Sequence, residues 1–260
     1  MAFTFKKLTL LLSLTVLFGM PNSYAQESPQ ALFDQANEQL ENSSYRQALS
    51  IYHRLESQNT ISGALFLNMA VSYQRLDSLG KAKYYFMKAS RFEETESTAT
   101  QALESVNQQF SRQSAVLPKL PWDVATEWMQ QHVGAGNLLL IAIILLNLGV
   151  LIFVAHWFFE FYPQYMRIGG MVLCGVALLI MAAGFYTRYV SNRYHSAVMV
   201  TEKTSVLEQP QQDASLVSQA FEGYTFTVDN HKSEPRQGWS YVRMSNGLYG
   251  WIPSSDILIL

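Results

Sequence analysis

The chain has 260 residues, a formal net charge of −2 and a single cysteine. With 18 basic and 20 acidic residues it has no basic footprint for nucleic acid, and one cysteine cannot build a disulfide or a cysteine metal cluster within one chain. Hydrophobic residues make up 49% of the chain and gather in blocks separated by polar sequence, so we expect a modular chain instead of one globular domain.

Residues 1–25 have the layout of a secretory signal peptide. Lys6 and Lys7 precede the apolar stretch 8–20, and Ala25 ends a small-residue pattern suited to a signal peptidase. The stretch is too short to cross roughly 30 Å of hydrocarbon comfortably. An uncleaved anchor is the alternative, and in both cases we expect the following segment to be exported.

Residues 26–112 show an internal period of 34 residues and resemble tetratricopeptide repeats, which are helical hairpins of that length. The second unit follows the family pattern closely, whereas the first is weaker in its first helix, and neither ends in the family's closing proline. Helical spacing without the signature over 99–110 predicts a capping helix. The pairs that carry the period are Ala36 and Ala70, Tyr45 and Leu79, Ala48 and Ala82, Tyr52 and Phe86, and Leu55 and Ala89.

Resemblance to tetratricopeptide arrays implies a concave face, formed by the first helix of each unit, that binds peptide or protein partners. Carried over by position, this face comprises Asn37, Leu40, Glu41, Leu67, Val71, Gln74 and Arg75. The alternative is that these side chains only solvate or cap the array. Two units and a cap are near the shortest array that stacking stabilises, so we expect partner contact or self-association.

Residues 113–136 predict an extended, proline-containing linker and then a short helix at the membrane surface. Pro121 and Asp123 suit the first turn of a helix, and Trp122 and Trp128 suit the membrane interface. We expect this segment to hold the repeat domain close to the bilayer.

Two apolar segments, 137–159 and 168–188, are long enough to span a bilayer as helices. The short connection 160–167 predicts a hairpin with a cytoplasmic loop, so the domains on either side of the hairpin share one compartment. Small residues along one stripe of the second helix would let the two backbones approach. The stripe consists of Gly170, Cys174, Ala177 and Gly184.

Charged and polar residues leave alternatives open for this hairpin. The loop contains Arg167, whereas Arg188 and Arg193 follow the second helix, so the positive-inside rule weakly opposes the expected orientation. The predicted signal peptide is stronger evidence for the orientation than this small number of arginines. Asn147 and His156 could line an ion or proton pathway, but contact with the partner helix and a place in an interfacial aromatic belt are the favoured interpretations.

Residues 196–260 change to short β-branched and aromatic runs, which predict a small barrel of five strands. Asn246 followed by Gly247 predicts a tight hairpin. The order of glycines, tryptophans and this turn resembles a bacterial SH3-like domain. A candidate binding face consists of Trp239, Tyr241, Tyr249 and Trp251, with core packing as the alternative for about half of them.

Catalytic and metal-binding motifs are absent from the sequence. Gly134 and Gly136 are wrongly placed for a phosphate loop, and the histidines show neither an HExxH motif nor paired spacing. We therefore expect no cofactor, no metal and no enzymatic activity. The histidines are His53, His132, His156, His195 and His231.

The order of leader, tetratricopeptide pair, two-helix hairpin and SH3-like barrel resembles the BatE proteins of the Bacteroidetes aerotolerance operon. The resemblance covers nearly the whole chain, and the combination carries it because each motif alone is common. It implies a non-enzymatic envelope component that acts with von Willebrand A-type membrane proteins and a MoxR-type ATPase in stress tolerance.

Together these features predict a multidomain membrane protein of the inner (cytoplasmic) membrane, with all-α hairpins and an all-β barrel on the periplasmic side. The leading hypothesis is a scaffold that binds other envelope proteins near the bilayer. The alternative is a wall-binding or envelope-sensing module in which the barrel holds peptidoglycan.

Overall fold

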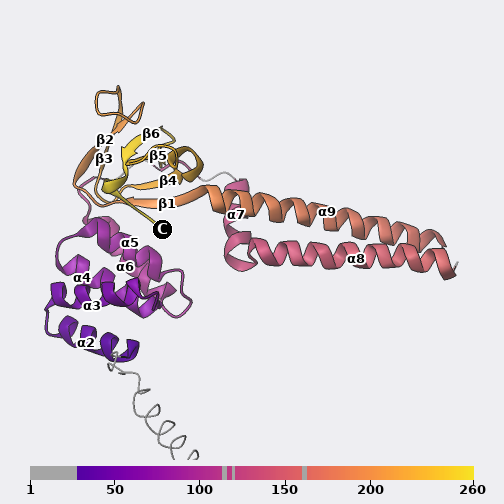
Figure 1. The fold of residues 1–260 in the computed structure, drawn as a ribbon, viewed down its shortest axis with the longest axis horizontal. Coiled ribbons are helices and arrows are strands. Elements are labelled where there is room, and N and C mark those ends of the chain that lie inside the picture. Colours follow the sequence, from indigo (N-terminus) through magenta and orange to yellow (C-terminus); the bar gives the residue numbers. More distant parts are fainter. Residues whose placement is uncertain (1–27, 113–115, 119–120, 160–162) are drawn as a thin grey trace, which may run out of the picture.

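The computed structural model describes residues 28–112, 116–118, 121–159 and 163–260. The signal peptide predicted for residues 1–25 lies outside the described residues. Figure 1 shows three parts, a helical array, a long pair of antiparallel helices and a domain of β-strands.

The helical array consists of two helical hairpins and a further helix. In the second hairpin both helices begin 34 residues after their counterparts in the first, which matches the period of the sequence. The helices are α2 (Pro29–Glu41), α3 (Tyr45–Ser57), α4 (Gly63–Arg75), α5 (Leu79–Ala89) and α6 (Glu96–Gln109).

Local chemistry repeats with the same period. Ser28 and Ser62 are the N-caps of α2 and α4, and each hydroxyl accepts a hydrogen bond of 3.1 Å from the amide three residues further on. Ser43 and Asp77 stand at equivalent turns with φ of 59° and 58°. The two hairpins therefore begin and turn in the same way.

The periodic residues form the core of the array. Small side chains lie where helices cross closely, and the aromatic rings of Tyr52 and Phe86 fill the space between hairpins, each removing enough apolar surface from water to contribute about 2 kcal/mol. The buried members of the periodic pairs are Ala36, Ala70, Ala48, Ala82, Tyr52, Phe86, Leu55 and Ala89.

A helical hairpin follows the array. Its helices are α8 (Ala135–Phe159) and α9 (Pro163–Arg193), and both are long and apolar enough to cross a membrane. Only 17% of the most apolar window of each helix is buried, unlike the core helix of a soluble protein. The short helix α7 (Pro121–His132) lies across the domain end of this hairpin (Figure 1).

The second apolar helix is longer than the expected 168–188. α9 begins at Pro163, inside the predicted loop 160–167, and it ends at Arg193, where strand β1 follows without a linker. Polar residues at both ends of the apolar run are compatible with helix, so the helix continues beyond the apolar part that hydropathy marks.

The β-domain has seven strands, not the five expected. They form one antiparallel sheet in the order β3-β2-β6-β5-β4-β1-β7, with the one-turn helix α10 (Asn230–Ser233) after β4. The strands are β1 (Tyr194–Met199), β2 (Lys203–Leu207), β3 (Leu216–Phe221), β4 (Thr225–Asp229), β5 (Trp239–Met244), β6 (Tyr249–Pro253) and β7 (Ile257–Ile259).

Strands β2 and β3 are the two that the sequence did not predict. Polar and small residues in these strands hide the alternation of apolar and polar side chains that marks a strand. Only Val206 and Leu207 are buried in β2, and only Ala220 is buried in β3. The core of the domain also includes Phe226 and Ile252.

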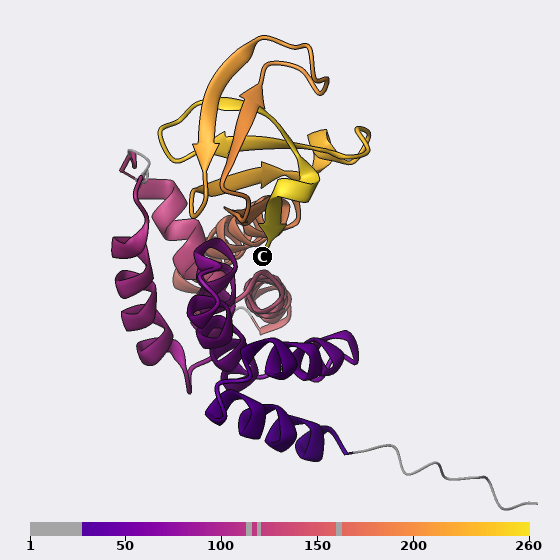
Figure 2. The ribbon, with the colours of Figure 1, turned by 90° about the vertical axis from the view of Figure 1, so that its left-hand side faces the viewer.

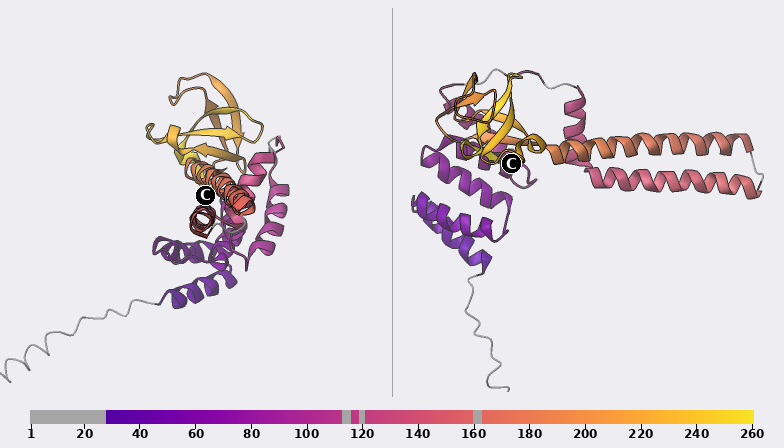
Figure 3. Two further views of the ribbon diagram at one scale, coloured as in Figure 1. Left: turned by 90° about the vertical axis from the view of Figure 1, so that its right-hand side faces the viewer. Right: turned by 45° about the horizontal axis from the view of Figure 1, so that its top comes forward.

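The helical array and the β-domain lie at the same end of the α8–α9 hairpin. Figure 1 and the right-hand view of Figure 3 agree on this arrangement. Figure 2 shows α2 to α6 curving below the β-domain, with α5 nearest to it. The described parts outside the hairpin are thus gathered on one side.

Candidate binding surfaces

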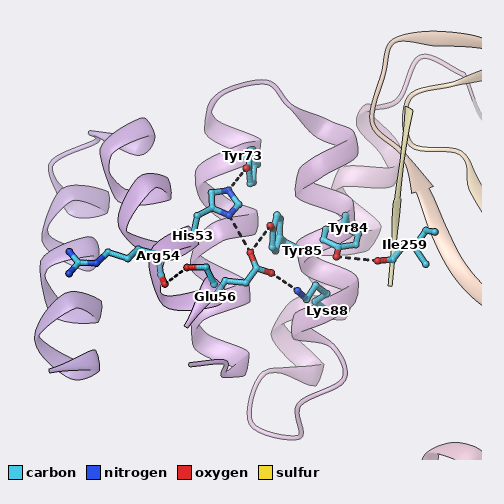
Figure 4. Close-up of polar contacts among 9 residues, drawn as sticks. His53, Arg54, Glu56, Tyr73, Tyr84, Tyr85, Lys88 and Ile259 are labelled. Carbon is cyan, nitrogen blue, oxygen red and sulfur yellow. Dashed lines mark hydrogen bonds and ion pairs between the residues drawn. The ribbon is translucent and has the colours of Figure 1, made fainter. Parts of the chain in front are cut away.

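A polar cluster centred on Glu56 joins three helices of the array (Figure 4). The Glu56 carboxylate accepts hydrogen bonds from the Tyr85 hydroxyl at 3.0 Å and from Nζ of Lys88 at 2.5 Å, both on α5. On α3, Nδ1 of His53 lies 3.2 Å from the carboxylate, and its Nε2 lies 2.7 Å from the Tyr73 hydroxyl on α4. With Nδ1 protonated, a neutral imidazole donates to Glu56 and accepts from Tyr73.

The electrostatics of this cluster favour a structural role. Burial works to raise the pKa of Glu56, but the hydrogen bonds from His53 and Lys88 outweigh it and hold that pKa at about 2. Burial and the Glu56 charge raise the pKa of Tyr85, so its hydroxyl stays protonated. Lys88 also lies 3.9 Å from the centroid of the Phe66 ring. Both carboxylate oxygens are used within the array, so the cluster links repeats.

Asn37, predicted to lie on the concave face, makes contacts within the array. Its side-chain oxygen accepts hydrogen bonds from the Tyr52 hydroxyl at 2.7 Å and from Nδ2 of Asn68 at 2.9 Å. This oxygen ties α2 to α3 and α4, and burial raises the pKa of Tyr52 to about 12, which keeps that donor protonated. The interactions of Asn37 are those of a positioning residue.

The other residues predicted for the concave face divide by exposure. Three are half-buried and pack against the array core: Leu40, Leu67 and Val71. On α4, Gln74 is half-buried and Arg75 is exposed, and on α2 Glu41 is exposed. The polar surface available to a partner is therefore Glu41, Gln74 and Arg75.

Three of the four predicted aromatic residues of the β-domain gather in one cluster. The ring centroids of Tyr241 and Trp251, cross-strand neighbours on β5 and β6, are 5.1 Å apart, and those of Tyr241 and Tyr249 are 6.1 Å apart. Nζ of Lys232 lies 4.2 Å from the Tyr241 centroid, and the guanidinium of Arg243 lies 5.8 Å from that of Tyr249. We call Tyr241, Tyr249 and Trp251 the aromatic face.

Trp239 lies apart from this cluster. It is half-buried on β5 opposite Pro253. Tyr241 and Trp251 are also half-buried, and Tyr249 is exposed, so none of the four predicted residues is fully buried. Aromatic rings beside cations on a partly exposed sheet can stack on a ligand and pair with its carboxylates.

The small-residue stripe of α9 faces α8. Gly170 and Gly184 are buried, Ala177 is 0% exposed, and Cys174 is half-buried. A methyl group at Gly149 of α8 would lie 2.6 Å from the Cys174 sulfur. The structure therefore places all four predicted residues where the two helices approach closely.

An interface between α5 and the β-domain was not predicted from the sequence. The amide of Gly80 donates to the Glu222 carboxylate at 2.7 Å, and Nζ of Lys83 donates to the Gly223 carbonyl oxygen at 2.7 Å. Burial lowers the pKa of Lys83 to about 8. A methyl group at Gly80 would lie 2.5 Å from the carbonyl oxygen of Met199, so only glycine allows this approach.

Further contacts extend this interface. The Tyr84 hydroxyl donates to the Ile259 carbonyl oxygen at 3.3 Å (Figure 4). Gly223, at φ +82°, leaves room for the ring of Phe110, which follows α6. Beside the interface, a cleft of about 510 Å³ carries charges of both signs, including Arg112 and Glu202. The array and the β-domain therefore form one packed unit.

A second joint ties the β-domain to α9. The Asp229 carboxylate, 6% exposed, accepts hydrogen bonds from Nε of Arg193 at 3.1 Å and from its Nη2 at 2.8 Å. The same carboxylate caps α10 by accepting from the Lys232 amide at 3.2 Å. Burial works to raise the pKa of Asp229, but the hydrogen bonds from Arg193 outweigh it and lower that pKa. Arg193 also donates to the Tyr189 hydroxyl one turn earlier in α9.

Comparison with protein families identifies the β-domain. Residues 206–257 match the family described as the bacterial dipeptidyl-peptidase SH3 domain. The match runs from β2 into the start of β7 and confirms the predicted bacterial SH3-like domain at the C-terminus. No curated protein matches the chain.

Proposed function

We propose that the chain is a non-enzymatic, membrane-anchored scaffold of the bacterial cell envelope. Its helical array, assigned to the tetratricopeptide type, and its β-domain, called the SH3-like barrel from here on, act as one binding unit beside the bilayer. The observation that carries the proposal is the packing of α5 against the barrel through Gly80 and Lys83.

Several features support this assignment. Two domains in direct contact must share a compartment, and the hairpin α8–α9 returns the chain to the side from which it entered. A signal peptide at residues 1–25 would put that side outside the cytoplasm. The scaffold would then project from the inner membrane into the periplasm.

The partners follow from the exposed chemistry and from the family resemblance. Glu41 and Arg75 offer opposite charges on neighbouring first helices of the array, which suits a protein partner with complementary charges. Resemblance to BatE proteins points to von Willebrand A-type membrane proteins acting with a MoxR-type ATPase.

Photo-crosslinking in intact membranes tests the scaffold role. A photoreactive amino acid at Glu41 or Arg75 of the full chain is expected to give adducts with other membrane proteins, identified by mass spectrometry. The same probe at the exposed Thr100 of α6 is the matched control. Equal yields at all three positions would contradict the proposal.

A second candidate function, binding of cell-wall peptide, is favoured by the aromatic face. Its rings lie beside Lys232 and Arg243, which could hold carboxylates of a peptide while the rings stack on it. The match to an SH3 domain of bacterial dipeptidyl-peptidases supports a peptide-bearing ligand.

Sedimentation with purified peptidoglycan tests the second function on the full chain in detergent. Tyr241→Ala together with Trp251→Ala should abolish cosedimentation, whereas Trp239→Ala, outside the cluster, should leave it intact. Cosedimentation that is absent in the wild type would exclude this function and leave the scaffold role standing.

A further inference from the structure

Aromatic side chains define where a bilayer would sit on the α8–α9 hairpin. At the loop end Trp157 and Tyr165 are 85% and 79% exposed, and at the domain end Tyr186 and Tyr189 are 50% and 52% exposed. Tyr165 and Tyr186 are 21 residues apart in one helix, which at about 1.5 Å per residue is roughly 32 Å, close to the hydrocarbon thickness. The two groups match the aromatic belts found at membrane interfaces.

The end of α9 continues past the domain-side belt. Gly184 lies against Leu138 and Leu139 near the start of α8, so the last residues of α9 extend beyond the end of its partner. From Tyr186 to Arg193 the helix rises by roughly 10 Å, which exceeds the roughly 5–8 Å depth of one headgroup layer and carries Arg193 to its outer edge. Since β1 follows without a linker, the barrel is held at a fixed depth next to this layer.

Cations gather at this level. Arg188 of α9, Lys232 of α10 and Arg236, whose amide donates to the Ser233 carbonyl oxygen at 2.9 Å, are exposed. α10 packs against α9. Within the described residues none of the three forms an ion pair, and the nearby Asp229 is engaged by Arg193. Glu234 is the exposed carboxylate in the same turn.

We propose that this collar, defined as Arg188, Tyr189, Tyr194, Lys232 and Arg236, binds the headgroups of anionic phospholipids. The cations would pair with lipid phosphates while Tyr189 and Tyr194, both partly exposed, lie at the interface. The Arg193–Asp229 joint fixes the collar against the membrane surface. The collar shares Lys232 with the peptide-binding aromatic face, whereas Arg188 and Arg236 belong to the collar alone.

Lipid selectivity of the full chain in detergent micelles tests the collar. Native mass spectrometry would follow the binding of phosphatidylglycerol and of phosphatidylcholine with the same acyl chains. At low salt the wild type should bind phosphatidylglycerol more tightly than phosphatidylcholine. The triple variant Arg188→Gln, Lys232→Gln and Arg236→Gln should lose this preference, by about fivefold for each cation removed.

Two matched variants keep the test specific. Replacing the exposed cations Arg46, Arg91 and Lys203 by Gln removes the same charge far from the membrane and should leave the preference unchanged. Arg188→Lys, Lys232→Arg and Arg236→Lys conserves charge and should also retain it. Equal binding of the two lipids by the wild type, or an equal loss in the distant triple variant, would overturn the proposal.

Discussion

Glu56 in the helical array and Asp229 at the contact between the β-domain and α9 are both carboxylates that bind together several elements. Glu56 is held by groups of different kinds from α3 and α5, whereas Asp229 is held by the two-pronged guanidinium of Arg193 and caps α10 as well. The first fixes the stacking of repeats within one domain. The second fixes the orientation of the barrel on α9.

This difference means that the two carboxylates should fail in different ways. Loss of Glu56 leaves the partly buried Lys88 without its ion pair inside the array. Loss of Asp229 leaves the barrel core intact, because that core is apolar. Loss of Glu56 should therefore lower the stability of the array, whereas loss of Asp229 should mainly loosen the contact between the barrel and α9.

The largest expected effect is that of Glu56→Ala. It should lower the unfolding free energy of the helical array by about 2–3 kcal/mol, because Lys88 and the Tyr85 hydroxyl lose their acceptor. Chemical denaturation of the full chain followed by far-UV circular dichroism would measure it. Glu104→Ala on the exposed face of α6 is the control and should change stability by less than about 0.5 kcal/mol.

Asp229→Ala should act on the joint at a cost of about 1–2 kcal/mol, the sum of a lost cap and a lost ion pair. Hydrogen exchange should increase at α10 and at the end of α9 while the barrel core stays protected. Faster exchange throughout Val206, Val242 and Ile252 would mean that Asp229 supports the fold itself.

Gly80→Ala leaves both carboxylates in place and tests the third contact. The added methyl group meets the Met199 carbonyl, so the array and the barrel should separate, with crosslinks between α5 and β1 falling about tenfold. Gly169→Ala, where a methyl group meets nothing within 4 Å, is the matched control. Unchanged crosslinking in Gly80→Ala would show that the interface tolerates a shift.

The smallest expected effect is a dependence on pH. The pKa of Glu56 is lowered from 4.5 to about 2 in the fold, so its stabilisation is present above pH 4.5 and is lost as the pH falls toward 2. Partial exposure reduces the loss between pH 5 and pH 3 to about 1 kcal/mol. Denaturation at pH 5 and pH 3 should show the loss in the wild type and a smaller one in Glu56→Gln. An equal loss of stability in the wild type and in Glu56→Gln would mean that the pH dependence comes from other carboxylates.

The sequence predicted the elements whose signals are local and periodic. The 34-residue period located the buried pairs from Ala36 to Ala89, and the apolar runs located α8 and α9. It missed β2 and β3, whose buried positions are few and small. A stretch with one or two buried residues carries too little pattern to be told from a loop.

Contacts between distant parts of the chain could not be predicted in the same way. Gly80 and Glu222 are 142 residues apart, and nothing local marks Gly80 as a point of close approach. Glu56 and Lys88 come from helices in different repeats, so their pairing depends on the packing of whole hairpins. Tyr241 and Trp251 are an exception among distant contacts, because they lie on two strands joined by the short turn at Asn246. That turn sets the strand register in which the two residues face each other.

The central claim is that the array and the barrel form one rigid unit at one end of the α8–α9 hairpin. Pulsed electron paramagnetic resonance between spin labels at Glu104 of the array and Glu208 of the barrel, in full-length Cys174→Ser in lipid bilayers, tests it most directly. We expect a single narrow distance distribution that broadens in Gly80→Ala. A broad distribution in the parent chain would contradict the account.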